Sequence, residues 1–405
     1  MFKKILITGL SVIALNIGNV LYANTSTDQQ INLATQKTIY HVPAPVPQVK
    51  AYLLMEYETG TVLAGKNIHE KIVPASLTKM LTSYVIGDLI KKGKISGSDT
   101  VEISKNAWSK NYSDSSKMFI EVGQKIPLSQ LNQGIIVASG NDACIAAAEY
   151  IAGTEQEFAK LLNTTAKNLG LKNSNFVNSH GLYDKNHYST AYDMALLARA
   201  LIRDLPEEYA IFAQKEILFN GIKQKNRNQL LWDTSMQVDG IKTGHLSQVG
   251  YNLVASAVNP RNGMRLISVV IGDISEAMRT KNSKALLEYG LKYYDKYTPL
   301  SKNQTITTKD VLFGETETVK LGINKDINLI IQTGQQEQLK ASFNLEKKRL
   351  SAPIKKEEVL GKLTITLNNE VIATTDLVAL EEVKEAGFIS RTWDLIKITV
   401  MDWFE

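Results

Sequence analysis

The pattern of apolar and polar positions changes several times along the chain, and each change predicts a different element. Apolar and polar residues alternate over residues 51–64 around a Glu-Thr-Gly turn, which predicts a β-hairpin. From Pro74 the apolar residues are spaced as on one face of a helix, and Pro74 and Ser76 stand where that helix begins. Two more helices are expected at about residues 142–151 and 156–169, because each stretch ends at a glycine.

The next part of the chain has the pattern of strands followed by a helix. Residues 236–271 predict two or three strands with a turn at 259–263, and a helix is expected over about 275–294. This order of strands, helices, strands and helix favours an antiparallel sheet with segregated helices. We therefore expect an α+β domain over residues 24–297.

Beyond about residue 298 the pattern changes again. Short strand-like runs appear, such as residues 327–331 and 363–367, and an Asn-Asn turn follows the second run. These runs predict a small all-β domain over residues 298–379. It contains no cluster of candidate catalytic groups.

The first 23 residues are typical of an export signal. Lys3 and Lys4 form a short basic region, residues 5–15 are mostly apolar, and Leu21-Tyr22-Ala23 is similar to a cleavage site with a small last residue. An uncleaved anchor is the alternative, but glycine and asparagine residues interrupt the apolar stretch, which is short for a span of ~20 residues. We expect residues 1–23 to be removed on export.

The last residues, 380–405, predict an amphipathic helix. One interpretation is a helix packed on its own domain. Tryptophan and phenylalanine on the apolar side of a terminal helix are more typical of a helix lying in the membrane interface, which predicts a peripheral membrane contact. The apolar stripe consists of Ile389, Trp393, Ile396, Val400, Trp403 and Phe404.

Composition excludes several classes of protein. The chain has 405 residues, 44% of them hydrophobic and 21% charged, which is typical of a globular protein. A single cysteine, Cys144, excludes an intrachain disulfide and a cysteine-rich metal site. The histidines lack metal-ligand spacing and no glycine-rich phosphate loop is present, so we expect neither a metal nor a cofactor. Removing residues 1–23 lowers the net charge from +5 to about +3, too little to indicate a nucleic-acid partner.

Three short motifs carry the candidate chemistry: Ser76-Leu77-Thr78-Lys79, Ser139-Gly140-Asn141 and Lys242-Thr243-Gly244. On a helix, residues three apart are neighbours, so the Lys79 amine can reach the Ser76 hydroxyl and act as its base. This role requires a lowered pKa for Lys79, and burial beside a second cation, for which Lys242 is the candidate, would lower it. Taken alone, Ser76 could be a simple N-cap.

The other two motifs also have simpler interpretations. Ser139-Gly140-Asn141 precedes a predicted helix and could serve as its N-cap. The pair Lys242-Thr243 could be solvated before a turn, but an ammonium beside a hydroxyl can also clamp a carboxylate, and Gly244 would let a substrate approach closely. The three motifs in this order are far more specific than any one of them, because penicillin-binding proteins and β-lactamases share the set.

At these motifs the chain resembles the penicillin-binding D-alanyl-D-alanine carboxypeptidases of low molecular mass, type 5/6. The resemblance runs from about residue 50 to the C-terminus and is most specific at residues 74–80, 139–144, 239–245 and 250–257. It implies a β-lactamase/transpeptidase-like domain, a β-rich domain and a membrane-binding helix. It also implies a periplasmic enzyme at the inner membrane that trims peptidoglycan stem pentapeptides, influences cell shape and binds β-lactams covalently.

The resemblance also implies roles for individual residues. Ser76 would be acylated, Lys79 would accept its proton, and Ser139 would relay protons to the departing D-alanine. Asn141 would hold the substrate amide. Lys242 and Thr243 would bind the terminal carboxylate, which Arg227 and Arg279 would orient. The backbone N–H groups of Ser76 and His245 would form the oxyanion hole, and Gly244 would let the substrate backbone approach.

One further residue matches the family pattern, and one segment departs from it. Asp204 matches a residue near the family's active-site loop. Residues 182–186 depart from the family pattern, so the shape of that loop is not predicted.

Several alternatives stay open. A class A β-lactamase would need a Glu-x-x-Leu-Asn run between the second and third motifs, and the chain has none there. An endopeptidase and a non-catalytic wall-binding protein are the other candidates. A Ser-His-Asp triad using His180 or His187 is also compatible with the sequence. Cys144 lies among small apolar residues and is expected to be packing rather than a nucleophile.

Overall fold

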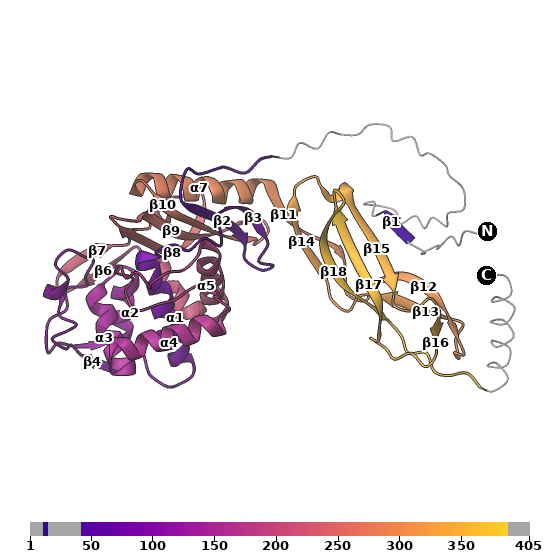
Figure 1. The fold of residues 1–405 in the computed structure, drawn as a ribbon, viewed down its shortest axis with the longest axis horizontal. Coiled ribbons are helices and arrows are strands. Elements are labelled where there is room, and N and C mark those ends of the chain that lie inside the picture. Colours follow the sequence, from indigo (N-terminus) through magenta and orange to yellow (C-terminus); the bar gives the residue numbers. More distant parts are fainter. Residues whose placement is uncertain (1–10, 15–41, 388–405) are drawn as a thin grey trace. The chain divides into compact units, whose positions relative to one another are not determined.

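The computed structural model describes residues 11–14 and 42–387 (Figure 1). Its contacts divide the chain into two units. One spans Val42–Tyr294, and the other begins at Asp295 and also includes residues 11–14. All residues of the predicted site lie in the first unit.

The first unit is built on a five-stranded antiparallel sheet in the order β3-β2-β10-β9-β8. β2 pairs with β3 as the hairpin that the sequence predicted, and β8, β9 and β10 are the strands predicted over residues 236–271. Alternation of buried residues is weak because helices cover both faces: α7 contacts β9 and β10, and α5 contacts β2 and β10. The strands are β2 (Ala51–Glu56), β3 (Val62–Lys66), β8 (Gln237–Leu246), β9 (Gly250–Val258) and β10 (Arg265–Asp273).

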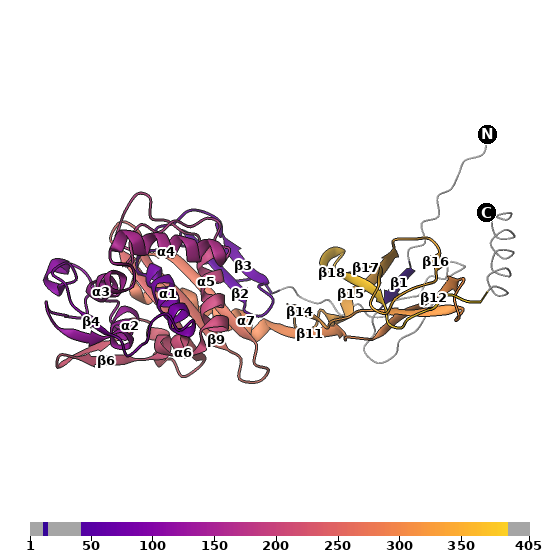
Figure 2. The same ribbon diagram turned by 90° about the horizontal axis from the view of Figure 1, so that it is seen from below.

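Helices α2, α4, α5 and α6 contact α1, α3 contacts α2 and α4, and α7 lies on the other side of the sheet (Figures 1 and 2). Side-chain caps set several helix starts: Thr154 accepts from the Glu157 amide, Thr190 from Asp193 and Ser275 from Met278. The helices are α1 (Lys79–Lys91), α2 (Leu128–Ile136), α3 (Asn141–Ala152), α4 (Glu155–Asn168), α5 (Ala191–Asp204), α6 (Pro206–Tyr209) and α7 (Glu276–Tyr293).

Short elements complete the unit. Two small hairpins pair β4 (Thr100–Glu102) with β5 (Lys125–Pro127) and β6 (Glu216–Phe219) with β7 (Ile222–Lys225). The 3-10 turns are η1 (Ala75–Thr78), η2 (Ser109–Tyr112), η3 (Ala210–Ala213) and η4 (Gln229–Trp232).

The predicted helices at 142–151, 156–169 and 275–294 are confirmed as α3, α4 and α7. The helix expected from Pro74 is more complex, because residues Ala75–Thr78 form η1 and the regular helix begins only at Lys79. Ala75 has a φ of 53°, a left-handed conformation that interrupts a regular helical start. Ser76 is therefore presented on a tight turn ahead of α1.

The second unit is the all-β domain predicted from the sequence. Its larger sheet has the order β1-β15-β17-β18-β13-β12-β16, and β11 pairs with β14. Alternating buried residues such as Leu363 and Ile365 form its core. The strands are β1 (Ser11–Ala14), β11 (Tyr294–Leu300), β12 (Thr305–Leu312), β13 (Thr318–Gly322), β14 (Ile327–Gln332), β15 (Leu339–Leu345), β16 (Leu350–Ser351), β17 (Val359–Leu367) and β18 (Glu370–Ala379), with the turn η5 (Gln336–Gln338).

Both predicted terminal segments lie mainly outside the described residues. Of the predicted export signal the structure describes Ser11–Ala14, which pairs with β15. Of the helix predicted over residues 380–405, residues 388–405 lie outside the described residues. The prediction is wrong for residues 380–387, which are not helical, because Val383 and Glu385 form β-bridges to Ile354 and Gly314. Within residues 11–14 and 42–387, no helix combines the length and apolar character needed to cross a membrane.

Candidate active site

The Ser76 hydroxyl lies beside a buried lysine. Lys79 Nζ is 3.0 Å from Ser76 Oγ, because η1 and the first turn of α1 place residues three apart on one side. The side chain of Ser76 caps neither η1 nor α1, so the N-cap interpretation is wrong.

Two further oxygens fix the direction of the Lys79 amine. Lys79 Nζ donates to Asn141 Oδ1 at 2.7 Å and to the His180 carbonyl at 2.7 Å. Both oxygens lack a hydrogen to donate here, so they can only accept. A neutral amine has two N–H groups and one lone pair. When the two carbonyl oxygens take the two N–H groups, the lone pair faces Ser76 Oγ, which is the geometry of a base.

The pKa of Lys79 is lowered to about 8, mainly because the amine is buried; the positive charge of Arg227 adds to this shift, while Asp142 opposes it. The pKa of Lys242 also lies well below its ordinary value, because of burial and the charges of Lys79, Arg227 and Arg279. The sequence predicted Lys242 as the second cation that lowers the pKa of Lys79. In the structure burial is the main cause, and the cation that adds to the shift is Arg227 rather than Lys242.

The second motif connects the two lysines to the cleft. Lys242 Nζ donates to Ser139 Oγ at 3.0 Å, and the Asn141 amide nitrogen donates to Ser115 Oγ at 2.9 Å. Gly140, not Ser139, occupies the N-cap position of α3 and makes no side-chain cap. Ser139 is thus available for chemistry rather than for capping.

Asp142 holds the loop opposite the motif. Its carboxylate accepts hydrogen bonds from the backbone amides of Met118, Phe119 and Ile120. These bonds fix the loop that carries Ser115 and Ser116, so the orientation of Asn141 depends on Asp142 through Ser115.

The third motif lies on β8, at the edge of the sheet beside η1. A Cβ on Gly244 would lie 2.9 Å from the Pro74 carbonyl oxygen and 3.2 Å from the Ser76 nitrogen. A side chain there would push β8 away from the Ser76 turn. Gly244 is therefore required by the contact between two parts of the chain, besides any approach of a substrate.

A polar cleft of about 590 Å³ joins these residues. Eight of the ten predicted site residues line it, and the other two, Lys79 and Lys242, lie beneath it in contact with Ser76 and Ser139. The eight are Ser76, Ser139, Asn141, Arg227, Thr243, Gly244, His245 and Arg279.

Two guanidinium groups line the cleft beside the carboxylates of Asp114 and Glu276, and Lys79 and Lys242 beneath it add further positive charge. Arg279 is 1% exposed, and its NH groups approach the carbonyl oxygens of Gly244 and Arg227 at 3.5 and 3.4 Å. Arg227 donates to the Ser116 hydroxyl. The His245 ring stacks on Tyr251 with the centroids 4.1 Å apart, which holds the end of β8 at the rim of the cleft.

A cationic cleft around a serine with an adjacent amine base suits acyl transfer from a substrate that ends in a carboxylate. The sequence profile of the family "D-alanyl-D-alanine carboxypeptidase" (Peptidase S11) matches residues 38–275. The chain belongs to this family. The match confirms the family predicted from the sequence. The profile "Penicillin-binding protein 5, C-terminal domain" matches residues 294–385.

Individual relatives agree with the family. The chain is 45% identical over 360 residues to D-alanyl-D-alanine carboxypeptidase DacA of Haemophilus influenzae, covering 88% of this chain and 91% of the relative. Among solved structures, penicillin-binding protein 5 from H. influenzae superposes with a TM-score of 0.77 at 44% identity over 85% of this chain and all of the other. Penicillin-binding protein D2 from Listeria monocytogenes, in its ampicillin-bound form, is 26% identical with a TM-score of 0.55, over 62% of this chain and all of the other.

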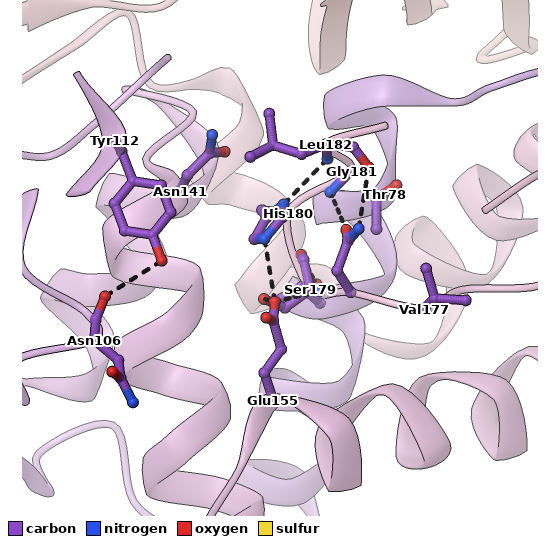
Figure 3. Close-up of polar contacts among 12 residues, drawn as sticks. Thr78, Asn106, Tyr112, Asn141, Glu155, Val177, Ser179, His180, Gly181 and Leu182 are labelled. Atoms are coloured by element: carbon purple, nitrogen blue, oxygen red, sulfur yellow. Dashed lines mark hydrogen bonds and ion pairs between the residues drawn. The ribbon is translucent and has the colours of Figure 1, made fainter. Parts of the chain in front are cut away.

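The alternative of a Ser-His-Asp triad that uses His180 or His187 is ruled out by the hydrogen-bond partners of the two imidazole rings. His180 accepts from the Leu182 amide at Nδ1 and faces Glu155 at Nε2 (Figure 3). His187 contacts the Val177 amide and the Thr78 hydroxyl. Both nitrogens of each ring are thus occupied away from Ser76. Burial lowers the pKa of His180 to about 3, so the ring is neutral.

Sequence reasoning missed part of the site and misplaced one residue. Ser115, Ser116 and Leu182 line the cleft, and the only sequence signal for the first two is a serine-rich stretch after Tyr112. Asp204 is not in the cleft, because it ends α5 and accepts from the Tyr84 hydroxyl.

Cys144 is confirmed as buried packing. It lies on α3 and is fully buried. Burial raises the pKa of its thiol to about 12, so the thiol stays protonated and is no nucleophile.

Proposed function

We propose that this chain removes the terminal D-alanine from peptidoglycan stem pentapeptides through an acyl-enzyme at Ser76. The observation that carries the proposal is the arrangement at Lys79, whose amine is held by two carbonyl oxygens and faces the Ser76 hydroxyl. A serine hydroxyl needs such a base to become a nucleophile.

In the first half of the reaction Lys79 takes the Ser76 proton, and Oγ attacks the carbonyl carbon of the penultimate D-alanine. The negative charge that develops on the carbonyl oxygen is stabilised by the backbone N–H groups of Ser76 and His245. When the peptide bond breaks, the proton that Lys79 took passes through Ser139, which accepts a hydrogen bond from Lys242, to the departing nitrogen, so Lys79 is neutral again. Free D-alanine and an ester on Ser76 result.

The carboxylate of the terminal D-alanine binds to the Thr243 hydroxyl and the arginines of the cleft, Arg227 and Arg279. Lys242 is 3% exposed and lies beneath the cleft, so it supports this binding through its charge and through Ser139. Asn141 holds the substrate amide. In the second half a water molecule adds to the ester, its proton returns through Lys79, and Ser76 is released.

A β-lactam follows the same first half, with the ring amide taking the place of the scissile peptide bond. Among the described residues, the carboxylates that line the cleft are Asp114 and Glu276, and Glu276 pairs with Arg279. Neither provides the dedicated deacylating glutamate of a class A β-lactamase. We therefore expect the penicilloyl-enzyme to be released slowly.

We place this activity at the periplasmic face of the inner membrane, reached by export and held by the C-terminal helix. The basic and apolar pattern of residues 1–23 and the apolar stripe of residues 389–404 support this placement. Recovery of full-length, uncleaved protein from the cytoplasm would contradict it.

The direct test is a pentapeptide assay with the full-length chain. We expect released D-alanine, and intact-protein mass spectrometry should show one penicillin added per chain. Ser76→Ala should abolish both, while Ser98→Ala, which changes an exposed serine of the same unit, should retain both. Label that survives in Ser76→Ala contradicts the assignment.

A further inference from the structure

The orientation of Lys79 depends on a carbonyl group whose position is itself controlled. The His180 carbonyl accepts from Lys79 at 2.7 Å and belongs to residues 178–182, which have no regular secondary structure. A peptide carbonyl in such a segment is fixed only by the bonds of its neighbours. The side chain of His180 provides two of those bonds.

The imidazole of His180 is held on both sides (Figure 3). Nδ1 accepts from the Leu182 amide at 3.1 Å, so the ring proton resides on Nε2, and Nε2 lies 3.2 Å from Glu155 Oε1. The same carboxylate oxygen accepts from the Ser179 amide at 3.1 Å and the Ser179 hydroxyl at 2.9 Å. Glu155 therefore binds two consecutive residues of the segment.

The peptide that follows His180 is also constrained. Gly181 has a φ of 88°, and a Cβ there would lie 1.9 Å from the Ala75 carbonyl oxygen. Its amide donates to Asn178 Oδ1 at 2.7 Å, and the Asn178 amide nitrogen donates to the Leu182 carbonyl at 3.0 Å. The segment is thus closed on itself and pressed against the residue before Ser76.

We propose that Glu155, acting through the imidazole of His180, is a positioning residue for the acyl-transfer reaction. By fixing the His180 carbonyl it keeps one N–H of Lys79 occupied and the lone pair directed at Ser76. Glu155 lies at the first position of α4, outside the cleft lining, and touches no reacting atom. This inference rests on the proposed role of Lys79 as the base.

Substitutions at Glu155 can distinguish the effect of side-chain length from the effect of negative charge. Gln keeps the length of the side chain and an oxygen that accepts from Nε2–H, whereas Asp keeps the charge but is one methylene shorter. The positioning role predicts that Glu155→Gln resembles the wild type and that Glu155→Asp and Glu155→Ala are impaired. Glu157→Gln is the matched control, because Glu157 also lies in the first turn of α4 but contacts Lys160.

The measurement is the stopped-flow acylation of the full chain by a fluorescent penicillin, analysed for the first-order rate constant and the dissociation constant before acylation. We expect Glu155→Ala to lower the rate constant roughly 10- to 100-fold, as a small misplacement of a reacting group does, with the dissociation constant nearly unchanged. A purely structural weakening would instead lower the melting temperature and alter both constants.

His180→Phe should lose as much as Glu155→Ala, and the double variant should lose no more, because both changes break one chain of contacts. Wild-type rates in Glu155→Ala, or a functional Glu155→Asp beside an impaired Glu155→Gln, would overturn the proposal. If Glu155→Ala does not fold, the Gln and Asp variants decide. Normal acylation by Lys79→Ala would instead show that the proposed base is wrong.

Discussion

The unit that holds the cleft buries charged side chains, whereas the β-rich unit keeps its charges at the surface. Among the described residues, the buried charged groups all lie within Val42–Tyr294, while the buried polar groups of the second unit are Gln332, Gln335 and Thr375. Burying a charge is costly unless it is paired, so such groups persist where they have a use. The buried charged residues are Glu56, Lys79, Asp142, Asp193, Lys242, Asp273 and Arg279.

Two lysines show the difference. Lys79 is fully buried and its pKa falls to about 8, mainly because burial disfavours the charge. Lys362 on β17 is exposed, and its hydrogen bond to Asp376 raises its pKa. A lysine side chain can therefore act as a base in the first unit, where its pKa is lowered, whereas in the second unit it is a solvated cation.

The largest expected effect comes from removing the Lys79 amine, and removal of the Lys362 amine is the comparison. Lys79→Ala should lower the rate of D-alanine release by about 10³-fold, because general-base catalysis by the amine is lost. Lys362→Ala should leave that rate unchanged. The D-alanine assay on both variants checks the contrast, and equal effects in the two would break it.

A smaller effect is expected from two threonines. Thr243→Val removes a hydroxyl of the cleft and should lower kcat/KM for the pentapeptide roughly 10- to 100-fold, because a hydrogen bond to a charged group is lost. Thr374→Val, at an exposed position of β18, is the control and should retain wild-type kinetics. A normal kcat/KM in Thr243→Val would show that the carboxylate binds elsewhere.

The smallest effect concerns stability and pH. The folded pKa of Lys79 is about 8 and its ordinary value is 10.5, so between these values the unfolded chain binds more protons and stability rises with pH. Relative to Lys79→Met, the wild type should therefore gain stability as the pH rises through this window. For Lys362 the pKa is raised in the folded state. Its contribution to the free energy of unfolding is therefore complete below pH 10.5 and is lost as the pH rises from there through the raised pKa.

Unfolding of the wild type and of Lys79→Met in denaturant at several pH values measures the change expected for Lys79. A difference between wild type and Lys79→Met that stays constant through the window would contradict the depressed pKa of Lys79.

The sequence predicts features of the fold and of the site well when the residues that determine them are close together along the chain, and poorly when they are far apart. Ser76 and Lys79 are three residues apart, so helical geometry predicted their contact, and α3 and α4 followed from apolar spacing and terminal glycines. The contact of Lys79 with Asn141 and His180 spans 62 and 101 residues, and no spacing rule predicts it. Only the family resemblance brought the three motifs together in advance.

α2 and α5 were not predicted, although α5 carries buried residues such as Met194, Leu197 and Leu201 at helical spacing, so the pattern was present in the sequence. Other features were beyond the sequence for physical reasons. The left-handed φ of Ala75 arises from tertiary contacts rather than from local preference. Residue 180 contacts Lys79 through its backbone carbonyl, a group that every residue has, so the identity of the residue did not indicate this contact.

The central claim is that Lys79, as a neutral amine, is the base for Ser76, and the pH dependence of acylation tests it most directly. The first-order rate constant for acylation by a penicillin should rise with pH, reach half of its maximum near the Lys79 pKa of about 8 and then level off. Ser76→Ala should show no acylation at any pH. A rate that does not vary with pH, or a midpoint near the ordinary histidine pKa of ~6.5, would contradict the account.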